Sequence, residues 1–264
     1  MKEDKTQIFN SAADFYDDAF TFSNIGVLQR NRVYFFLEQF GFFKEKKKVF
    51  EINCGTGFDA EEFYRKGHQV IATDGSSKMI ELCKQLRSKE IEFYQLSFQE
   101  IDKAEKLAKS DFLFSNFGGL NCLDKHDLSL MVNTVASKQK RGDQLAWVII
   151  PKHCLWESVY LFVKGRWSQI GRRNTNKALS VEVDWEKVPT YYHSPKEIES
   201  ILEKNYNVLQ IKPIAFFLPP SYLEPFFSKN KWFLHFLNNF EKLFGNWSLL
   251  ANWSDHYIIL AEKK

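Results

Sequence analysis

The sequence has few of the features that cross-link a chain or fix it in a bilayer. Its 264 residues include only four cysteines, without a C-x-x-C pair or a histidine at metal-ligand spacing: Cys54, Cys83, Cys122 and Cys154. This spacing predicts reduced thiols and indicates neither disulfides nor a metal site. No apolar run approaches the roughly 20 residues of a membrane-spanning helix, and the first residues lack the apolar core of a signal peptide. We therefore expect a cytoplasmic protein without a membrane span.

A strong excess of charge is also missing. The formal net charge is +3, which does not demand a polyanionic partner. The contents of hydrophobic residues (44%) and charged residues (26%) are those of an ordinary globular protein. What is abundant is aromatic residues, at 16% with 26 phenylalanines. This composition predicts a heavily aromatic core or an apolar pocket.

The most informative pattern begins at residue 49. An apolar run over 49–52 leads to Gly55 and Gly57, and Asp59 and Glu62 follow at the spacing of a capping box. The pattern predicts a strand, a glycine turn and a helix. Glycine lets the backbone adopt positive φ and approach a ligand without a Cβ in the way.

A second apolar run, over 70–72, ends close to Asp74. The whole stretch therefore predicts a β-α-β unit with a carboxylate at the tip of its second strand. A carboxylate in this position can accept hydrogen bonds from both hydroxyls of a ribose. Ser76 and Ser77 then cap the next predicted helix. We expect a nucleotide-type ligand at this edge.

The acid-x-Asn-x-Gly-x-Gly pattern that begins at Glu51 resembles the first motif of class I S-adenosylmethionine-dependent methyltransferases, which reads acid-x-Gly-x-Gly-x-Gly. Asn53 replaces the first glycine, and asparagine tolerates the left-handed region. The resemblance extends over about residues 48–150. It implies S-adenosylmethionine as the cofactor and a small molecule as the methyl acceptor.

The resemblance also implies a cofactor site at the carboxyl ends of the first four strands. At the end of the third strand, the family often carries an acid for the adenine amino group, where this chain has Ser97. After the fourth strand come adjacent glycines and two asparagines, which suit a backbone that meets a ligand. The implied cofactor-binding residues are Glu51, Asn53, Cys54, Gly55, Thr56, Gly57, Asp74, Gly75, Ser76, Met79, Ser97, Phe98, Asn116, Phe117 and Gly118.

Strands that alternate with helices predict an α/β, doubly wound, Rossmann-like sheet of about seven strands. The resemblance implies that the last strand is antiparallel and inserted between strands five and six. The strands are expected at 49–52, 70–72, 91–95, 111–115, 144–150, within 208–218 and at 257–261, with a further strand at 179–185. Helices are expected at 8–20 and 24–40, from 59, 77 and 124, at 195–205 and at 231–244.

We expect a single domain over 1–264. It is predicted to comprise N-terminal cap helices over 1–44, a cofactor-binding core over 45–150, an insertion over 151–194 and a C-terminal part over 195–264 with a helical insertion at 219–250. The aromatic stripe of the helix over 231–244 fits either a lid above an apolar pocket or core packing.

In the resembled reaction, alignment of donor and acceptor supplies roughly 7–11 kcal/mol. A general base adds on the order of 10²- to 10⁴-fold. Positioning therefore outweighs the base. The candidates for a catalytic side chain are Tyr16, His153 and His193, and each also fits an ordinary polar role.

Two other functions stay open at this stage. The basic stretch over 152–177 fits a nucleic-acid methyltransferase, although more often such a stretch is a solvated loop face. The Asn/Asp-Pro-Pro-aromatic motif expected for that class is absent after the fourth strand, where residues 116–119 read Asn-Phe-Gly-Gly. Asn53, Ser97 and the lack of an obvious base also fit a non-catalytic cofactor-binding subunit. The pattern makes no prediction about the oligomeric state.

Overall fold

The computed structural model describes residues 13, 16–183 and 186–264, without the side chains of residues 182–186. The expected helix over 8–20 therefore lies mostly outside the described residues. Its described end, Asp17–Thr21, forms one turn of π-helix. The second expected helix is α2 (Asn24–Gln39), which Ser23 caps by accepting a hydrogen bond from the Gly26 amide.

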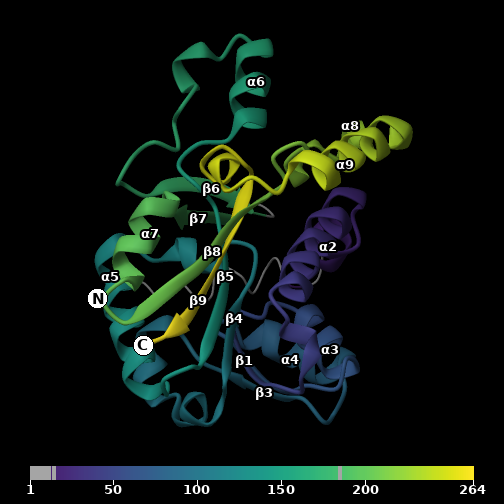
Figure 1. Cartoon of the computed structure of the whole chain (residues 1–264). Helices are drawn as coiled ribbons and strands as arrows, with labels where there is room; N and C mark the ends of the chain where they lie inside the picture. Colours follow the sequence, from purple (N-terminus) through teal and green to yellow (C-terminus); the bar gives the residue numbers. More distant parts are fainter. Residues whose placement is uncertain (1–12, 14–15, 184–185) are drawn as a thin grey trace.

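A seven-stranded sheet forms the centre of the molecule in the order β3-β2-β1-β4-β5-β9-β8 (Figure 1). Strand β9 is antiparallel to both neighbours, and the other pairs are parallel. The expected fold class and the position of the last strand are thus confirmed. The strands are β1 (Lys48–Ile52), β2 (Gln69–Asp74), β3 (Glu92–Gln95), β4 (Phe112–Ser115), β5 (Gln144–Ile149), β8 (Tyr206–Ile214) and β9 (His256–Lys263).

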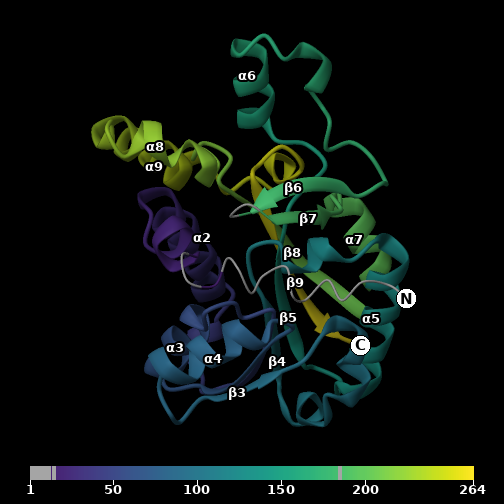
Figure 2. The same ribbon diagram turned by 180° about the vertical axis from the view of Figure 1, so that it is seen from behind.

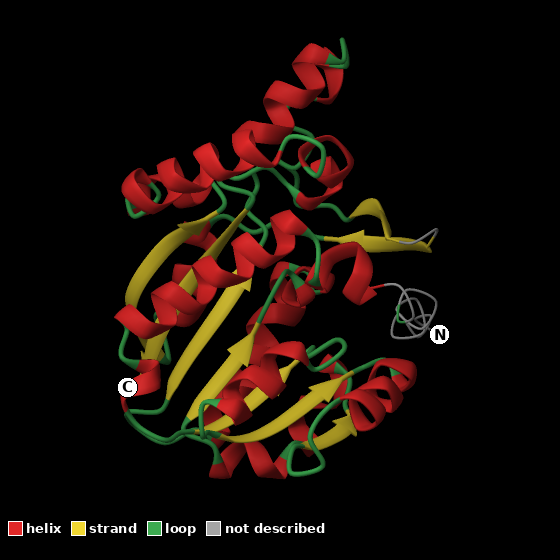
Figure 3. Ribbon diagram, turned by 90° about the vertical axis from the view of Figure 1, so that its right-hand side faces the viewer, coloured by secondary structure: helices red, strands yellow, loops and turns green. Residues whose placement is uncertain are grey.

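Helices cover the two faces of this sheet (Figure 3), and an apolar layer lies between the sheet and the helices on each face. Because successive strand residues point to opposite faces, Val49 enters one layer and Phe50 the other. The first layer packs against α2, α3 (Phe58–Arg65), α4 (Ser77–Leu86) and α9 (Lys231–Phe244), and the second against α5 (Lys125–Lys138) and α7 (Pro195–Leu202). Each large side chain buried here stabilises the fold by about 1.5–3 kcal/mol.

Aromatic rings account for much of the first layer. Phe42 lies 4.3 Å from Phe112 and 5.1 Å from Phe63 between ring centroids, and Phe63 lies 4.9 Å from Phe114. All four side chains are fully buried. The prediction of a heavily aromatic core is therefore confirmed for this part of the chain.

Besides the capping box expected at Asp59 and Glu62, the sequence Ser194-Pro195-Lys196-Glu197 predicts a second one, and the structure contains the second. Ser194 and Glu197 exchange both capping hydrogen bonds at the start of α7, with Pro195 in the first turn. The box expected at Asp59 and Glu62 is wrong, because α3 begins at Phe58 after Gly57 in the left-handed conformation. The side chain of Asp59 instead contacts another helix, as described below.

The two expected insertions lie beyond the edge at which the parallel strands end (Figures 1 and 2). The first contains α6 (Leu155–Val163) and a hairpin of β6 (Leu179–Val183) and β7 (Glu186–Thr190). The strand expected at 179–185 is thus present, while its partner β7 was not expected. The second contains α8 (Glu224–Phe227) and α9. Among the described helices, none combines the length and the apolar character that crossing a bilayer requires.

Candidate functional site

A cavity of about 530 Å³ opens at the carboxyl ends of the parallel strands. This is the edge at which open parallel sheets bind ligands. Of the predicted cofactor residues, eleven line this cavity: Asn53, Gly55, Asp74, Gly75, Ser76, Met79, Ser97, Phe98, Asn116, Phe117 and Gly118. Three others, Glu51, Cys54 and Thr56, line a smaller adjoining cavity of about 30 Å³.

Asn53 forms the first residue of the ligand-facing turn with φ of 50°, in the region that glycine normally occupies. Its side chain connects the ends of two strands: Nδ2 donates to Asn116 O (3.1 Å) and Oδ1 accepts from Ser115 Oγ (2.7 Å). Gly119 packs directly on this side chain, since a Cβ at Gly119 would lie 2.3 Å from Asn53 Cγ. The asparagine therefore keeps the turn and adds a cross-link that glycine lacks.

Gly57 does not face either cavity. Its φ is 71°, and an added Cβ would lie 2.9 Å from both Cys83 Sγ and Phe93 Cε1. The α-carbon of Gly57 therefore faces the core behind the turn, and its contact with a cofactor stays a prediction. At Gly55, by contrast, the nearest atom to an added Cβ is Tyr16 Cε1, at 3.8 Å across the cavity.

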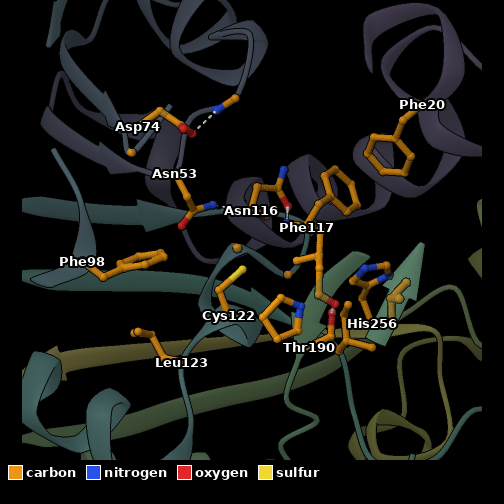
Figure 4. Close-up of a pocket in the computed structure, with 18 of the residues that line it drawn as sticks. Phe20, Asn53, Asp74, Phe98, Asn116, Phe117, Cys122, Leu123, Thr190 and His256 are labelled. Atoms are coloured by element: carbon orange, nitrogen blue, oxygen red, sulfur yellow. Dashed lines mark hydrogen bonds between the residues drawn. The ribbon is translucent and has the colours of Figure 1, made fainter. Parts of the chain in front are cut away.

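Asp74 occupies the predicted position at the tip of β2. Its Oδ2 accepts from the Gly55 amide and its Oδ1 from the Ser76 amide, both at 2.9 Å (Figure 4). Burial raises the pKa of Asp74 to about 6, although these backbone hydrogen bonds act in the opposite direction. A carboxylate has about four acceptor positions, so both oxygens can still accept hydrogen bonds from a ligand.

The smaller cavity brings together charged groups that the sequence pattern did not single out. Arg30 of α2 is 5% exposed, and its Nε donates to Asp59 Oδ1 at 3.1 Å. Asp59 also accepts hydrogen bonds from Tyr34 and Asn116. Among the described residues, Arg30 Nη1 and Glu51 Oε2 have no hydrogen-bond partner. Burial, followed by the charge of Asp59, raises the pKa of Glu51 well above its ordinary value.

The N-terminal segment closes over the glycine turn. Thr56 donates to Asp17 Oδ1 (2.6 Å), and Arg87 Nη2 lies 2.9 Å from Asp17 Oδ2. Tyr16 consequently lines both cavities. Burial raises the pKa of Tyr16 to about 12, so the phenol stays protonated and can donate a hydrogen bond.

One end of the main cavity is a largely apolar slot. Phe98, Cys122 and Leu123 gather there, with Ile101 and Met79 also in the lining (Figure 4). Ser97 lines the same end, and its hydroxyl donates to Glu100 Oε2 at 3.0 Å. The slot is therefore suited to a flat group with a polar edge.

The other end of the cavity is formed by residues from the first insertion and from the start of β9. Arg173 is 6% exposed, and its Nε donates to Glu157 Oε2 at 2.9 Å. Arg173 Nη2 lies 3.6 Å from Asp255 Oδ1, and Arg172 also pairs with Glu157 at 3.0 Å. The two carboxylates thus neutralise two basic residues of the 152–177 stretch. Arg173 Nη1 is buried without a hydrogen-bond partner among the described residues.

All six histidines belong to the described part of the chain, and His256 is the one that lines the cavity. Its Nδ1 lies 3.2 Å from Asp255 Oδ2, and its ring packs edge-on against Phe117 (Figure 4). Burial alone would raise the pKa of Asp255. The charge and hydrogen bond of His256, with Arg173 and Gln29, nevertheless hold that pKa below its ordinary value.

The two histidines predicted as candidate bases lie elsewhere. His193 is buried, and its Nε2 lies 3.0 Å from Leu123 O. His153 stacks on Trp253 at 4.8 Å between ring centroids. Neither lines either of these two cavities, and a catalytic role for them stays a prediction. His256 was missed because it lies one residue before a predicted strand, with no motif around it.

The insertions contribute unequally to the cavity. The first supplies much of the far wall, with Glu157, Arg172, Val181 and Tyr192 among its lining residues. The second contributes only Pro220, Ser221 and Tyr222. Helix α9 adds no residue to this lining, which speaks against the lid among the two uses that the sequence left open for its aromatic stripe.

Comparisons with known proteins agree with this geometry. Residues 49–142 match the family model described as a methyltransferase domain. No curated protein matches the sequence significantly. Among solved structures, magnesium protoporphyrin IX methyltransferase from Synechocystis PCC 6803, with bound S-adenosylmethionine, has a TM-score of 0.58 at 15% identity, over 100% of this chain and 99% of that one.

Two further solved structures show the same arrangement. An S-adenosylmethionine-dependent methyltransferase from Archaeoglobus fulgidus has a TM-score of 0.56 at 16% identity, over 95% of this chain and 99% of that one. The complex of DhpI with S-adenosylhomocysteine has a TM-score of 0.59 at 12% identity, over 98% of this chain and 96% of that one. The chain thus has the Rossmann-like fold of class I methyltransferases. More particularly, residues 49–142 match the model of a methyltransferase domain, which confirms the resemblance drawn from the motif at Glu51.

Proposed function

We propose that the protein is an S-adenosylmethionine-dependent methyltransferase that acts on a small, partly apolar acceptor. The observation that carries the proposal is the position of Asp74. It lies at the tip of β2, bonded to the Gly55 amide and facing a 530 Å³ cavity within a methyltransferase domain. When bound, S-adenosylmethionine supplies a methyl group on a sulfonium, which is already an activated leaving group.

The residues present fit this cofactor in three places. Asp74 accepts hydrogen bonds from the ribose hydroxyls, and the slot at Phe98 and Leu123 receives the adenine. In the smaller cavity, the buried Nη1 of Arg30 would bind the methionine carboxylate. An unpartnered buried guanidinium N–H carries a substantial desolvation penalty, which such a ligand would remove.

His256 is the side chain placed to take a proton from the acceptor. Asp255 lies beside Nδ1 and can orient the ring, so that Nε2 faces the acceptor as the base. The acceptor lies between His256 and the apolar wall that Val181, Val188 and Tyr222 form. Arg173 Nη1 is available to one oxygen of the acceptor.

The test uses S-adenosylmethionine with a tritiated methyl group and, as a mixed acceptor, a cell extract that contains both small molecules and nucleic acid. We expect the label in extractable products, with a strong loss for Asp74→Ala and His256→Ala. The exposed change Lys125→Ala on α5 is the control. Label that instead collects in nucleic acid would contradict the small-molecule acceptor. Turnover that persists in His256→Ala would remove His256 as the base. A cytoplasmic location stays a prediction.

A further inference from the structure

Two segments expose much of the apolar surface of the molecule. They are residues 152–177, with α6, and residues 221–253, with α8 and α9. They make up about a fifth of the chain but hold 16 of the 21 large apolar side chains that are exposed in the described part. Figures 1 and 2 both show α6, α8 and α9 beyond the carboxyl edge of the sheet. We call this surface the apolar end.

Helix α9 shows that this exposure is built into the sequence pattern. Residues three, four and seven apart share a helix face. Leu234, Asn238 and Glu241 form the buried face. Trp232 (75% exposed), Phe236 (49%) and Leu243 (70%) lie on the opposite face. An ordinary surface helix has a polar outer face, whereas the outer face of α9 is apolar.

The charges of the apolar end have one sign. Its exposed charged side chains are all basic: Lys164, Arg166, Arg172, Lys177, Lys229, Lys231 and Lys242. The acids within the two segments are turned inward. Glu157 and Glu241 are buried, and the carboxylate of Glu224 accepts hydrogen bonds from Asn24 and from the Ile25 amide. In the described part of these segments, no acidic side chain is exposed.

We propose that the apolar end docks on the surface of an anionic lipid bilayer, without spanning it. Tryptophan and phenylalanine side chains partition into the interfacial layer, and lysine and arginine beside them attract anionic headgroups. A second copy of this chain is a poorer partner, because it would bring like charges together. A nucleic acid would offer nothing to the exposed aliphatic side chains Val163, Leu243 and Leu249, which cannot stack on bases.

The docking surface adjoins the mouth of the cavity. Tyr222 lines the cavity and is also 48% exposed, and its ring lies 5.8 Å from that of Tyr160 on α6. A lipid-soluble acceptor could therefore pass from the bilayer into the cavity. This consequence rests on the proposed function, whereas docking itself does not.

The test is flotation of the full-length protein with vesicles of phosphatidylcholine alone or with 30% phosphatidylglycerol. We expect binding to the anionic vesicles, weakened by salt. The double variant Trp232→Ser/Leu243→Ser should bind at least tenfold more weakly. Leu86→Ser/Leu130→Ser is the matched control, since both leucines are more than half exposed on other helices. The variant Lys231→Glu/Lys242→Glu should also bind the anionic vesicles at least tenfold more weakly. Its control, Lys125→Glu/Lys140→Glu, should keep the affinity of the unmodified protein.

Melting temperature and affinity for S-adenosylhomocysteine should be unchanged in the two apolar-end variants, which separates docking from folding and from the proposed function. Failure of the unmodified protein to float with anionic vesicles would overturn the proposal. An equal loss of vesicle affinity in the control pairs would also overturn it. The same holds if the protein binds no vesicles but forms a dimer that Trp232→Ser/Leu243→Ser dissociates, or if it binds a single-stranded oligonucleotide more tightly than the vesicles.

Discussion

Asn53 shows how a polar side chain takes the place of a glycine in a ligand-binding turn. It accepts a left-handed φ of 50°, and its amide cross-links the ends of β1 and β4. Gly119 must then be a glycine, because any Cβ would overlap the Asn53 side chain. The two positions are therefore coupled: an asparagine at position 53, where the motif has glycine, requires a glycine at position 119.

We expect Gly119→Ala to destabilise the protein by about 1–3 kcal/mol, as over-packing does. Asn53→Gly should cost about 1 kcal/mol, because two hydrogen bonds are lost. In the double variant, the alanine at 119 should cost almost nothing further, since the clashing side chain is gone. Urea denaturation of the four proteins measures this coupling. Additive losses would show that the two residues are independent.

Asp74 is held in a state that favours ligand binding over stability. Its pKa of about 6 in the folded protein exceeds the ordinary value of 3.8. A carboxyl whose pKa is raised by folding stabilises the fold below pH 3.8, and this contribution is lost as the pH rises through 6. Ionised Asp74 therefore costs on the order of 3 kcal/mol at neutral pH.

Asp74→Asn should raise the free energy of unfolding of the ligand-free protein at pH 7.5 by on the order of 1–3 kcal/mol. Its melting temperature should rise accordingly. The gain should shrink at pH 4.5, where Asp74 is largely protonated. Calorimetric melts at both pH values measure it. Asp102→Asn, an exposed aspartate, is the control. A variant that is less stable at pH 7.5 would contradict the raised pKa.

Affinity for the cofactor should follow the ionisation of Asp74. At pH 5, one unit below that pKa, about a tenth of the carboxyl is ionised. We expect the Kd for S-adenosylhomocysteine to rise about tenfold between pH 7 and pH 5. In Asp74→Asn the profile should be flat, and titration at four pH values distinguishes the two. The same slope in the variant would assign the effect to another group.

Among single residues, the spacing of the motif predicted the cavity-lining residues that lie close to the motif in the sequence. Asp74, Gly55 and Phe98 line the cavity as expected. Arg30 and His256 reach the cavities from α2 and from β9, far from the motif, and no local pattern distinguishes them from other polar residues. Spacing cannot show which side of a turn a Cβ would face, so it did not predict that Gly57 faces the core.

Among the elements, α9 packs on the sheet and is also hydrogen-bonded to the end of β8 through a buried carboxylate. Glu241 accepts hydrogen bonds from the amides of Ala215 (3.0 Å) and Phe217 (2.7 Å), just after β8. Ala215 has a φ of 61°, so the chain turns sharply there. Arg32 of α2 lies 3.7 Å from the same carboxylate. The anchor therefore joins the second insertion, the sheet and the N-terminal helix.

Glu241→Ala should destabilise the protein by about 3–5 kcal/mol, because it leaves the buried Arg32 without its charge partner and two amides without an acceptor. Glu241→Gln should cost less, since burial raises the pKa of Glu241 and the amide oxygen can still accept. Thermal melts measure both, with the neighbouring exposed Lys242→Ala as control. Equal stability of all three variants would show that the anchor contributes nothing.

Elements with strong local signals were predictable from the sequence. Ser194, Pro195 and Glu197 mark the start of α7, and apolar runs mark the strands. Asp59 carried an equally good local signal and was misassigned. Its carboxylate forms tertiary bonds with Arg30, Tyr34 and Asn116. Tertiary contacts overrode the cap, and only the folded chain reveals them.

For the whole molecule, the alternation of strands and helices predicted the sheet, and the resemblance predicted the place of its last strand. The far half of the cavity could not be predicted in the same way. It joins Arg173, Thr190, Tyr222 and His256, which are distant in sequence and belong to different elements. Periodicity describes single elements, so it cannot show which of their ends meet.

The most direct test of the account is calorimetric titration of the unmodified protein with S-adenosylhomocysteine at pH 7.5. We expect one molecule bound per chain, and an affinity that falls by about 10- to 100-fold in Asp74→Ala, because hydrogen bonds to a charged group contribute about 1.5–3 kcal/mol. Asp102→Ala should bind like the unmodified protein. Absence of binding, or an unchanged affinity in a folded Asp74→Ala variant, would contradict the account.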